Sequence, residues 1–277
     1  MGNKMIKTSW GNVAKWYDDL VEGEGTYQKD VILPNIVRLL ALKKSLPRTG
    51  VERLVRGETV LDVGCGQGFF VREFLKTGAK IIGVDVAPEL IAFAKKNVPS
   101  AQFHVASADA MPFVKTVSVD AATTILALQN IENVDGVFAE CTRVLKAHGR
   151  LLIVMNHPAF RIPQHSSWDW GKKGSSDASV GGTPSGVQYR RIDEYLSESR
   201  TNIQMHPGEN PTATTVSFHR PLQWYVKLLA KHGFAVTRLE EWISNKKSQK
   251  GPRQKAEDTA RKEIPLFLFL EARILEK

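Results

Sequence analysis

The sequence predicts an α/β protein with a mostly parallel β-sheet covered by helices on both faces. Two observations predict this fold class. Between residues 59 and 155, short apolar segments alternate with segments of helical periodicity. These apolar segments contain almost no polar residues, which is typical of parallel strands buried on both faces.

The alternation gives a definite order of elements. We expect five strands in this region, at residues 59–63, 80–84, 102–106, 119–126 and 150–155. The helices between them are expected at residues 67–77, 88–97 and 134–146. After an irregular stretch, the rhythm returns with a strand at 215–219, a helix at 221–232, and strands at 234–240 and 265–274.

Two further regions complete the predicted domain organisation. Residues 10–20 and 27–42 each show an apolar stripe at helical spacing, so residues 1–50 are predicted to form a helical cap. Residues 156–214 have little periodicity and are rich in glycine and serine. A stretch of this length inside a domain is usually functional or disordered, and we interpret it as a substrate lid. The α/β domain then comprises residues 51–155 and 215–277.

Composition limits the classes of function. The chain has 277 residues with two cysteines, Cys65 and Cys141, which is too few for a disulfide framework. It has no secretory signal pattern and no apolar run long enough to span a bilayer, so the cytoplasm is the expected compartment. The net charge of +9 allows a polyanionic partner, but most basic residues are scattered. A basic protein without such a partner is therefore favoured, and the oligomeric state stays open.

The strongest chemical signal is the segment TVLDVGCGQGFF at residues 59–70. It contains a buried strand, a turn with Gly64, Gly66 and Gly68, and the start of a helix. Glycine is needed where the backbone turns sharply and approaches a ligand, and the N-terminus of a helix offers free N–H groups. Asp62 stands two residues before this turn.

Two more carboxylates follow neighbouring strands. Asp85 ends the next strand, where a carboxylate can accept hydrogen bonds from the paired hydroxyls of a ribose. Asp109 follows the third strand, where it could meet the exocyclic amine of an adenine. Because the carboxyl ends of parallel strands meet at one edge, these groups are expected around a single ligand site.

Together these segments make the sequence resemble the class I S-adenosylmethionine-dependent methyltransferases. LDVGCGQG is similar to the first motif of that family, and Asp85, Asp109 and the segment VDAATTILALQNIEN match its later motifs in order and spacing. The resemblance implies a Rossmann-like, seven-stranded, mostly parallel sheet. It also implies S-adenosylmethionine as cofactor and S-adenosylhomocysteine as product. Within the family, the sequence is most similar to the small-molecule branch that includes ubiquinone and menaquinone methyltransferases.

The resemblance also implies roles for individual residues. Gly64 and Gly66 would line the methionine portion of the cofactor, Asp85 would bind its ribose, and Asp109 would bind its adenine. The remaining expected cofactor contacts are Asp62, Cys65, Gly68, Val86, Ala110, Met111, Leu126, Gln129 and Tyr17. A nicotinamide or flavin dinucleotide is the alternative cofactor, but Phe69 occupies the third glycine position of that fingerprint.

Candidates for catalysis lie after the fifth strand. A hydroxyl acceptor would need a base, and His157, Tyr189 and His219 are the candidates. No histidine shows metal-ligand spacing, so no metal is expected. Aromatic and basic residues in 156–214 suit a flat or anionic small-molecule acceptor.

Two other functions stay open. An RNA or tRNA methyltransferase is suggested by the basic segment 246–262, whose local charge is +5. No RNA-binding module accompanies this segment, so a nucleic-acid partner is the less favoured reading. A non-catalytic protein that binds the cofactor, or a scaffold, is the third.

Overall fold

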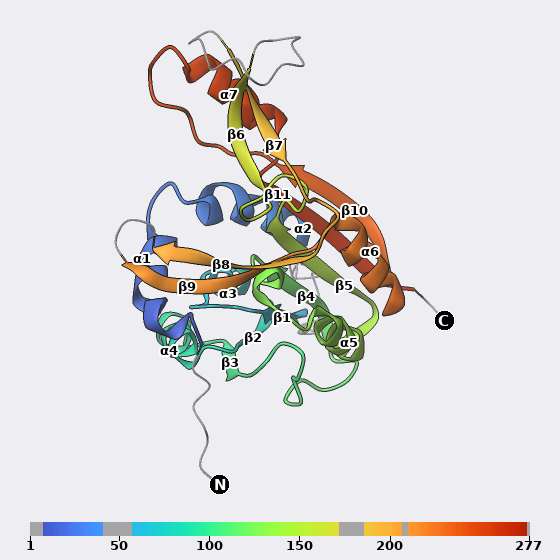
Figure 1. The fold of residues 1–277 in the computed structure, drawn as a ribbon. Coiled ribbons are helices and arrows are strands. Elements are labelled where there is room, and N and C mark those ends of the chain that lie inside the picture. The colour runs from blue at the N-terminus through green and yellow to red at the C-terminus, as the bar shows by residue number, and fades with distance from the viewer. Residues whose placement is uncertain (1–7, 41–56, 172–185, 207–209, 276–277) are drawn as a thin grey trace, which may run out of the picture.

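The computed structural model describes residues 8–40, 57–171, 186–206 and 210–275. Its central sheet has seven strands in the order β10-β11-β5-β4-β1-β2-β3, with helices on both sides (Figure 1). Neighbouring strands from β5 to β3 run parallel, and β11 is antiparallel to both β5 and β10. The predicted seven-stranded, mostly parallel fold is confirmed.

The main-sheet strands agree closely with the predicted segments. Their bounds are β1 Thr59–Val63, β2 Lys80–Asp85, β3 Gln102–Val105, β4 Val119–Ile125, β5 Leu145–Asn156, β10 Phe234–Trp242 and β11 Phe267–Ile274. Strand β5 begins five residues before the predicted start. The register between β4 and β5 shifts after Val119, and His148 adopts a left-handed φ of 64° in the irregular part. The last two residues of the helix predicted at 134–146 therefore belong to the irregular start of β5.

The helices also follow the expected order. Their bounds are α1 Ala14–Glu22, α2 Leu33–Leu40, α3 Phe69–Leu75, α4 Pro88–Asn97, α5 Val134–Val144, α6 Leu222–Lys231 and α7 Gln254–Glu263. Short helices precede or connect them at Gly11–Val13, Gln28–Ile32 and Leu128–Asn130. Of the predicted cap, residues 1–7 and 41–50 lie outside the described ranges.

Side chains that alternate along the strands form a separate core on each face of the sheet. One core joins α2 and α3 to the sheet through residues such as Ile36, Phe74 and Val154. The other joins α5 and α6 through Phe138 and Leu229. Both faces are thus buried, which explains why the strands are apolar without alternation.

The segment 156–214 contains more regular structure than the sequence suggests. It holds β6 Ser166–Gly171, β7 Val187–Ile192, β8 Ser199–His206 and the start of β9 Asn210–His219. These strands pair as two antiparallel hairpins, β6–β7 and β8–β9. The predicted strand at 215–219 therefore belongs to a hairpin and not to the main sheet. The hairpins escaped prediction because two-stranded ribbons bury only part of each face.

The basic segment 246–262 contains most of helix α7. Within the described ranges, no helix combines the length and apolarity required to cross a bilayer.

Candidate functional site

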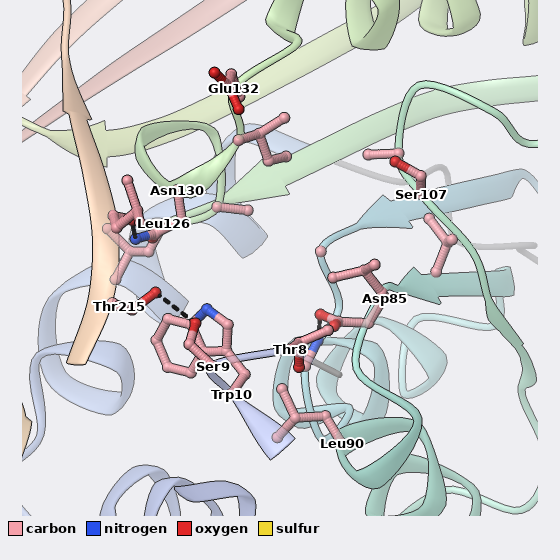
Figure 2. A pocket seen from close by; sticks show the side chains of 18 of the residues that line it. Thr8, Ser9, Trp10, Asp85, Leu90, Ser107, Leu126, Asn130, Glu132 and Thr215 are labelled. Carbon is pink, nitrogen blue, oxygen red and sulfur yellow. Dashed lines mark hydrogen bonds between the residues drawn. The ribbon is translucent and has the colours of Figure 1, made fainter. Parts of the chain in front are cut away.

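A cavity of about 490 Å³ lies at the carboxyl edge of the sheet. It is lined by residues that follow β1, β2, β3 and β4, together with residues from the N-terminal segment and from β8 and β9. Figure 2 shows Asp85 and Leu90 on one side, facing Leu126, Asn130 and Thr215 on the other. This volume is within the usual range for small-molecule sites, and the edge is where open α/β sheets bind ligands.

The glycine turn after β1 forms part of the cavity floor. The backbone N–H groups of Gly64 and Cys65 both donate to the carbonyl of Val84, at 2.8 and 3.0 Å. Gly64 and Gly66 adopt left-handed φ angles of 75° and 55° and both line the cavity. A Cβ on Gly64 would lie 2.5 Å from the Cβ of Ala127. The turn therefore needs glycine both for its backbone angle and for space.

Asp85 lines the cavity at the end of β2 and is held by the backbone around it. Its Oδ2 accepts from the Gly66 N–H at 3.0 Å, and its Oδ1 accepts from the Ala87 N–H at 2.9 Å. Burial raises the pKa of Asp85, while these two bonds favour the charged form. Each oxygen keeps a second lone pair, so the carboxylate can accept from a pair of ligand hydroxyls.

Asp62 occupies a different position from the one the motif suggests. Its side chain is 2% exposed, accepts from Thr123 Oγ1 at 2.7 Å, and does not belong to the cavity lining. Burial raises the pKa of Asp62 to about 7. Asp62 thus supports the strand beneath the glycine turn.

The raised pKa of Asp62 predicts a pH-dependent stability. An unfolded aspartate has a pKa of about 3.9, so the unfolded chain loses this proton first as pH rises. The contribution of Asp62 to the free energy of unfolding therefore decreases between about pH 4 and pH 7. The difference in free energy of unfolding between Asp62→Asn and the parent protein should therefore change by about 2 kcal/mol in favour of the variant as pH rises from 5 to 8. Urea unfolding at each pH measures this difference.

Asp135 provides the control for that series. Hydrogen bonding from Lys231 lowers the pKa of Asp135, so Asp135→Asn should lose stability relative to the parent as pH rises through the acidic range. If the free energy of unfolding changes equally with pH in the parent protein and in Asp62→Asn, the prediction that folded Asp62 has a raised pKa is wrong.

Asp109 lies on the rim of the cavity between two side chains that orient it. Ser107 Oγ donates to Oδ1, and Asn133 Nδ2 donates to Oδ2 at 2.7 Å. The hydrogen bond from Ser107 is the main reason that the pKa of Asp109 is lowered. Asn133 also caps α5 by accepting from the Gly136 N–H at 3.0 Å. Asn133 was not predicted, although its position at a helix start was a usable signal.

Several expected cofactor residues line no part of the cavity. Met111 is fully buried in the core beside α5, its N–H donates to Glu140, and its carbonyl accepts from Arg143. Met111 was expected as a cofactor contact, but it does not line the cavity. The others that lie outside the lining are Cys65, Gly68, Ala110 and Gln129. Those that line it are Tyr17, Gly64, Gly66, Asp85, Val86, Asp109 and Leu126.

The end of β4 carries a strained residue. Leu126 lines the cavity with a φ of 55°, a left-handed angle that costs a leucine about 1–2 kcal/mol. Its N–H donates to Val154, and its carbonyl accepts from Gln129 Nε2 at 2.8 Å. Gln129 therefore acts on the cavity through Leu126.

Another part of the cavity lining combines two distant segments of the chain. Thr8, Ser9 and Trp10 come from the N-terminal segment, and Thr215, Val216 and Phe218 come from β9. Ser9 Oγ and Thr215 Oγ1 are 2.9 Å apart, and Asn130 Nδ2 donates to the Val216 carbonyl at 2.8 Å. None of these residues was predicted as a site residue, because the strand at 215–219 was expected in the main sheet and the N-terminal segment as part of a helical cap.

Tyr17 adds an uncharged hydroxyl beside the glycine turn. Its ring packs edge-on against Trp10, with centroids 5.3 Å apart. Burial, followed by the charge of Asp85, raises the pKa of Tyr17 to about 12. The phenol therefore stays protonated and can donate a hydrogen bond.

The three predicted catalytic residues lie away from the cavity lining. His157 is 3% exposed, its Nε2 bonds to Glu241 at 2.7 Å, and its Nδ1 accepts from the Ala159 N–H at 3.2 Å. His219 Nε2 bonds to the Tyr195 carbonyl at 2.8 Å, and Tyr189 is in hairpin β6–β7. Position after the fifth strand suggested His157, but its ring packs on Phe160 instead of facing the cavity.

These contacts predict a structural effect for His157→Ala. The change removes two hydrogen bonds and leaves the Ala159 N–H without its acceptor, so we expect a loss of about 1–3 kcal/mol in the free energy of unfolding. Urea unfolding measures this effect. His232→Ala, which removes a surface pair with Asp135, should cost less than about 1 kcal/mol. Equal stability of His157→Ala and the parent protein would contradict this assignment.

The cavity combines an acidic rim with apolar surfaces. Asp85, Asp109 and Glu132 supply carboxylates, and Trp10, Leu90 and Phe218 supply apolar area. Such a site can accept hydrogen bonds from hydroxyl and amino groups while enclosing a flat ring. In the part of the chain that the structure describes, no cluster of His, Cys, Asp and Glu is arranged to hold a metal ion.

Comparisons with known proteins agree with this geometry. A family model described as a methyltransferase domain matches residues 61–153. Over 106 residues, the chain is 35% identical to the demethylmenaquinone methyltransferase of Tropheryma whipplei (strain Twist), covering 37% of this chain and 44% of that protein. It is 31% identical to the ubiquinone biosynthesis O-methyltransferase of Xanthomonas oryzae pv. oryzae (strain PXO99A), covering 35% of this chain and 42% of that protein. The matches thus span less than half the length of these two relatives.

A solved structure extends the likeness over more of the chain. The S-adenosylmethionine dependent methyltransferase from Mesorhizobium loti superposes with a TM-score of 0.59 at 24% identity, covering 80% of this chain and 93% of that one. At this level of identity, the comparison shows a shared fold.

Proposed function

We propose that this chain is a class I S-adenosylmethionine-dependent methyltransferase that transfers a methyl group to a small-molecule acceptor. The methyltransferase domain match at residues 61–153 and the fold shared with an S-adenosylmethionine dependent methyltransferase support the proposal. The observation that carries the proposal is the Asp85 carboxylate at the cavity rim. Both of its oxygens are held by backbone N–H groups, from Gly66 and Ala87, and both retain acceptor capacity. That arrangement suits the paired hydroxyls of a ribose.

The residues around Asp85 fit the rest of an adenosine. Val86, Leu90 and Ala108 give an apolar surface next to the Asp109 carboxylate, which can accept from an exocyclic amine. A Cβ on Gly66 would project to within 3.5 Å of the Tyr17 ring, so glycine at this position keeps the space beside Tyr17 open. Asp109 and Asp85 also favour the positive charge of a sulfonium.

The chain's own residues would orient the reactants and exclude water. S-adenosylmethionine, when bound, supplies an activated methyl group, so alignment is the main requirement. Trp10 and Tyr17 cover the glycine turn, and the protonated Tyr17 hydroxyl can hold an oxygen of a ligand in place. No histidine belongs to the cavity lining among the described residues. This favours an acceptor whose attacking atom is nucleophilic without a histidine base.

The acceptor is proposed to be a flat, aromatic small molecule. Trp10 and Phe218 both line the cavity and offer ring surfaces, and aromatic rings stack or pack edge-on against such surfaces. The two relatives compared above are named for demethylmenaquinone and ubiquinone biosynthesis, which supports a ring of the quinone type. The basic segment 246–262 includes most of α7, which lies with β6–β7 at the other end of the molecule from α4 and β3 (Figure 1). The segment therefore gives an RNA acceptor no support at this cavity.

Calorimetry followed by label transfer tests the proposal. S-adenosylhomocysteine should bind with measurable heat, and incubation with methyl-labelled cofactor and a cell extract should place label in the small-molecule fraction. Label in the RNA fraction would show that the acceptor is a nucleic acid and not a small molecule. Binding without transfer to any fraction would favour a non-catalytic protein, and absence of binding would reject the cofactor assignment.

A further inference from the structure

Three arginines gather at the base of hairpin β6–β7, on the side that faces α7. Trp168 of β6 pairs directly with Arg190 of β7, so the two side chains share one face of the hairpin. The guanidinium groups of Arg161 and Arg190 lie over the Trp168 ring, at 5.6 and 5.3 Å from its centroid. Helix α7 packs against β7 and contributes Arg261. We call Arg161, Arg190 and Arg261 the arginine cluster.

The positive charge of the arginine cluster is not balanced. The Nε atoms of Arg161 and Arg261 are buried and have no hydrogen-bond partner. Arg190 donates to Ser166 and to the Phe160 carbonyl, which are neutral acceptors. Across the described ranges, none of the three forms an ion pair with a carboxylate. A buried guanidinium without an anionic partner is costly.

Nearby groups do not supply the missing charge. Asp258 on α7 interacts with the charges of Arg261 and Lys262, but no ion pair joins it to Arg261 within the described ranges, so it balances that charge only in part. Lys246, whose ammonium lies 5.5 Å from the centroid of the Tyr27 ring, adds another cation on the side of Arg161. Burial, followed by the charge of Arg161, lowers the pKa of Arg190 to about 10. The surroundings therefore leave the cluster electropositive.

We propose that the arginine cluster binds a phosphate group of a small molecule. Guanidinium groups form bidentate hydrogen bonds with phosphate oxygens. The terminal Nη–H groups of Arg161 and Arg261 are the available donors, because within the described ranges they are neither buried without a partner nor hydrogen-bonded to a protein acceptor. A phosphate dianion matches several cations better than a single carboxylate does. The arginines are half-buried, which favours a terminal phosphate over the extended backbone of a nucleic acid.

This site is separate from the proposed methyl-transfer cavity. None of the three arginines belongs to the cavity lining, and hairpin β6–β7 with α7 projects from the end of the molecule away from α4 (Figure 1). The inference therefore does not depend on the proposed function, and each can fail without the other.

Thermal unfolding and calorimetry of the full chain test the site with inorganic phosphate and pyrophosphate as probes. Both anions should raise Tm above the value in sodium chloride of equal ionic strength, because a ligand that binds only the folded state stabilises it. Arg161→Gln and Arg261→Gln should each weaken pyrophosphate binding at least about tenfold. Neither arginine side chain has a hydrogen bond among the described residues, so both variants are expected to fold.

Arg191→Gln is the matched control. Arg191 neighbours Arg190 in β7 but points to the opposite face, where it pairs with Asp193, so its loss should change pyrophosphate affinity less than about twofold. Three outcomes would overturn the proposal: a Tm shift equal to that in chloride, equal weakening in Arg191→Gln, or binding of an RNA oligonucleotide without binding of pyrophosphate.

Discussion

Asp85→Asn should bind S-adenosylhomocysteine at least about 100-fold more weakly than the parent protein. This corresponds to a loss of about 3 kcal/mol in binding free energy. An asparagine has one acceptor oxygen, whereas the Gly66 and Ala87 N–H groups each donate to a separate oxygen of Asp85. One of these N–H groups would therefore face an NH₂ group, and the turn that carries Gly66 would shift. The charge that favours ligand hydroxyl donors would also be lost. Isothermal titration calorimetry measures the change.

Asp120→Asn provides the control for this prediction. Asp120 also accepts from a backbone N–H, that of Thr59 at 2.8 Å, and pairs with Lys146 at 2.8 Å. It lies at the amino end of β4, at the opposite edge of the sheet from the cavity. Its replacement should leave affinity within about twofold. If both variants bind like the parent protein, Asp85 does not contact the ligand.

Gly64→Ala is expected to destabilise the protein by about 2–5 kcal/mol and to abolish ligand binding. The left-handed φ of 75° costs an alanine about 1–2 kcal/mol. A Cβ at 2.5 Å from that of Ala127 adds a steric cost of about 1–3 kcal/mol. Relief of this overlap moves either the glycine turn or the loop after β4, and both line the cavity. Urea unfolding and calorimetry measure the two effects.

Gly78→Ala separates the backbone cost from the steric one. Gly78 has a similar φ of 86°, but a Cβ there would have no atom within 4 Å. For Gly78→Ala, we expect the free energy of unfolding to decrease by about 1–2 kcal/mol and the ligand affinity to stay unchanged. Similar losses in the two variants would show that the contact with Ala127 relaxes without cost.

The part of the fold that was predictable from the sequence is the part with strong periodicity. Strand β1 and helix α4 were predicted at their observed bounds, because a continuous apolar run or a proline at the first turn marks them. Gly64 and Gly66 were predicted because the turn requires glycine, and Asp85 was predicted because it ends a parallel strand; all three line the cavity. These features are local, so one stretch of sequence contains the whole signal.

The rest of the site depends on tertiary structure. Trp10 and Phe218 meet at the cavity although their segments are far apart in the sequence, and neither lies in a motif. His157 shows the converse: its position after β5 suggested catalysis, but Glu241 of β10 holds its ring away. Periodicity predicts which face of a helix or strand is buried, but it does not predict which distant segment packs against that face.

The bond between Ser9 and Thr215 joins hydroxyls 206 positions apart in the chain, which has a consequence for biosynthesis. The segment that holds Asp85 leaves the ribosome well before β9 is synthesised. A nascent chain that ends before residue 210 should therefore retain ligand only briefly, since one wall of its pocket is missing. Completion of hairpin β8–β9 is then the event that slows ligand escape.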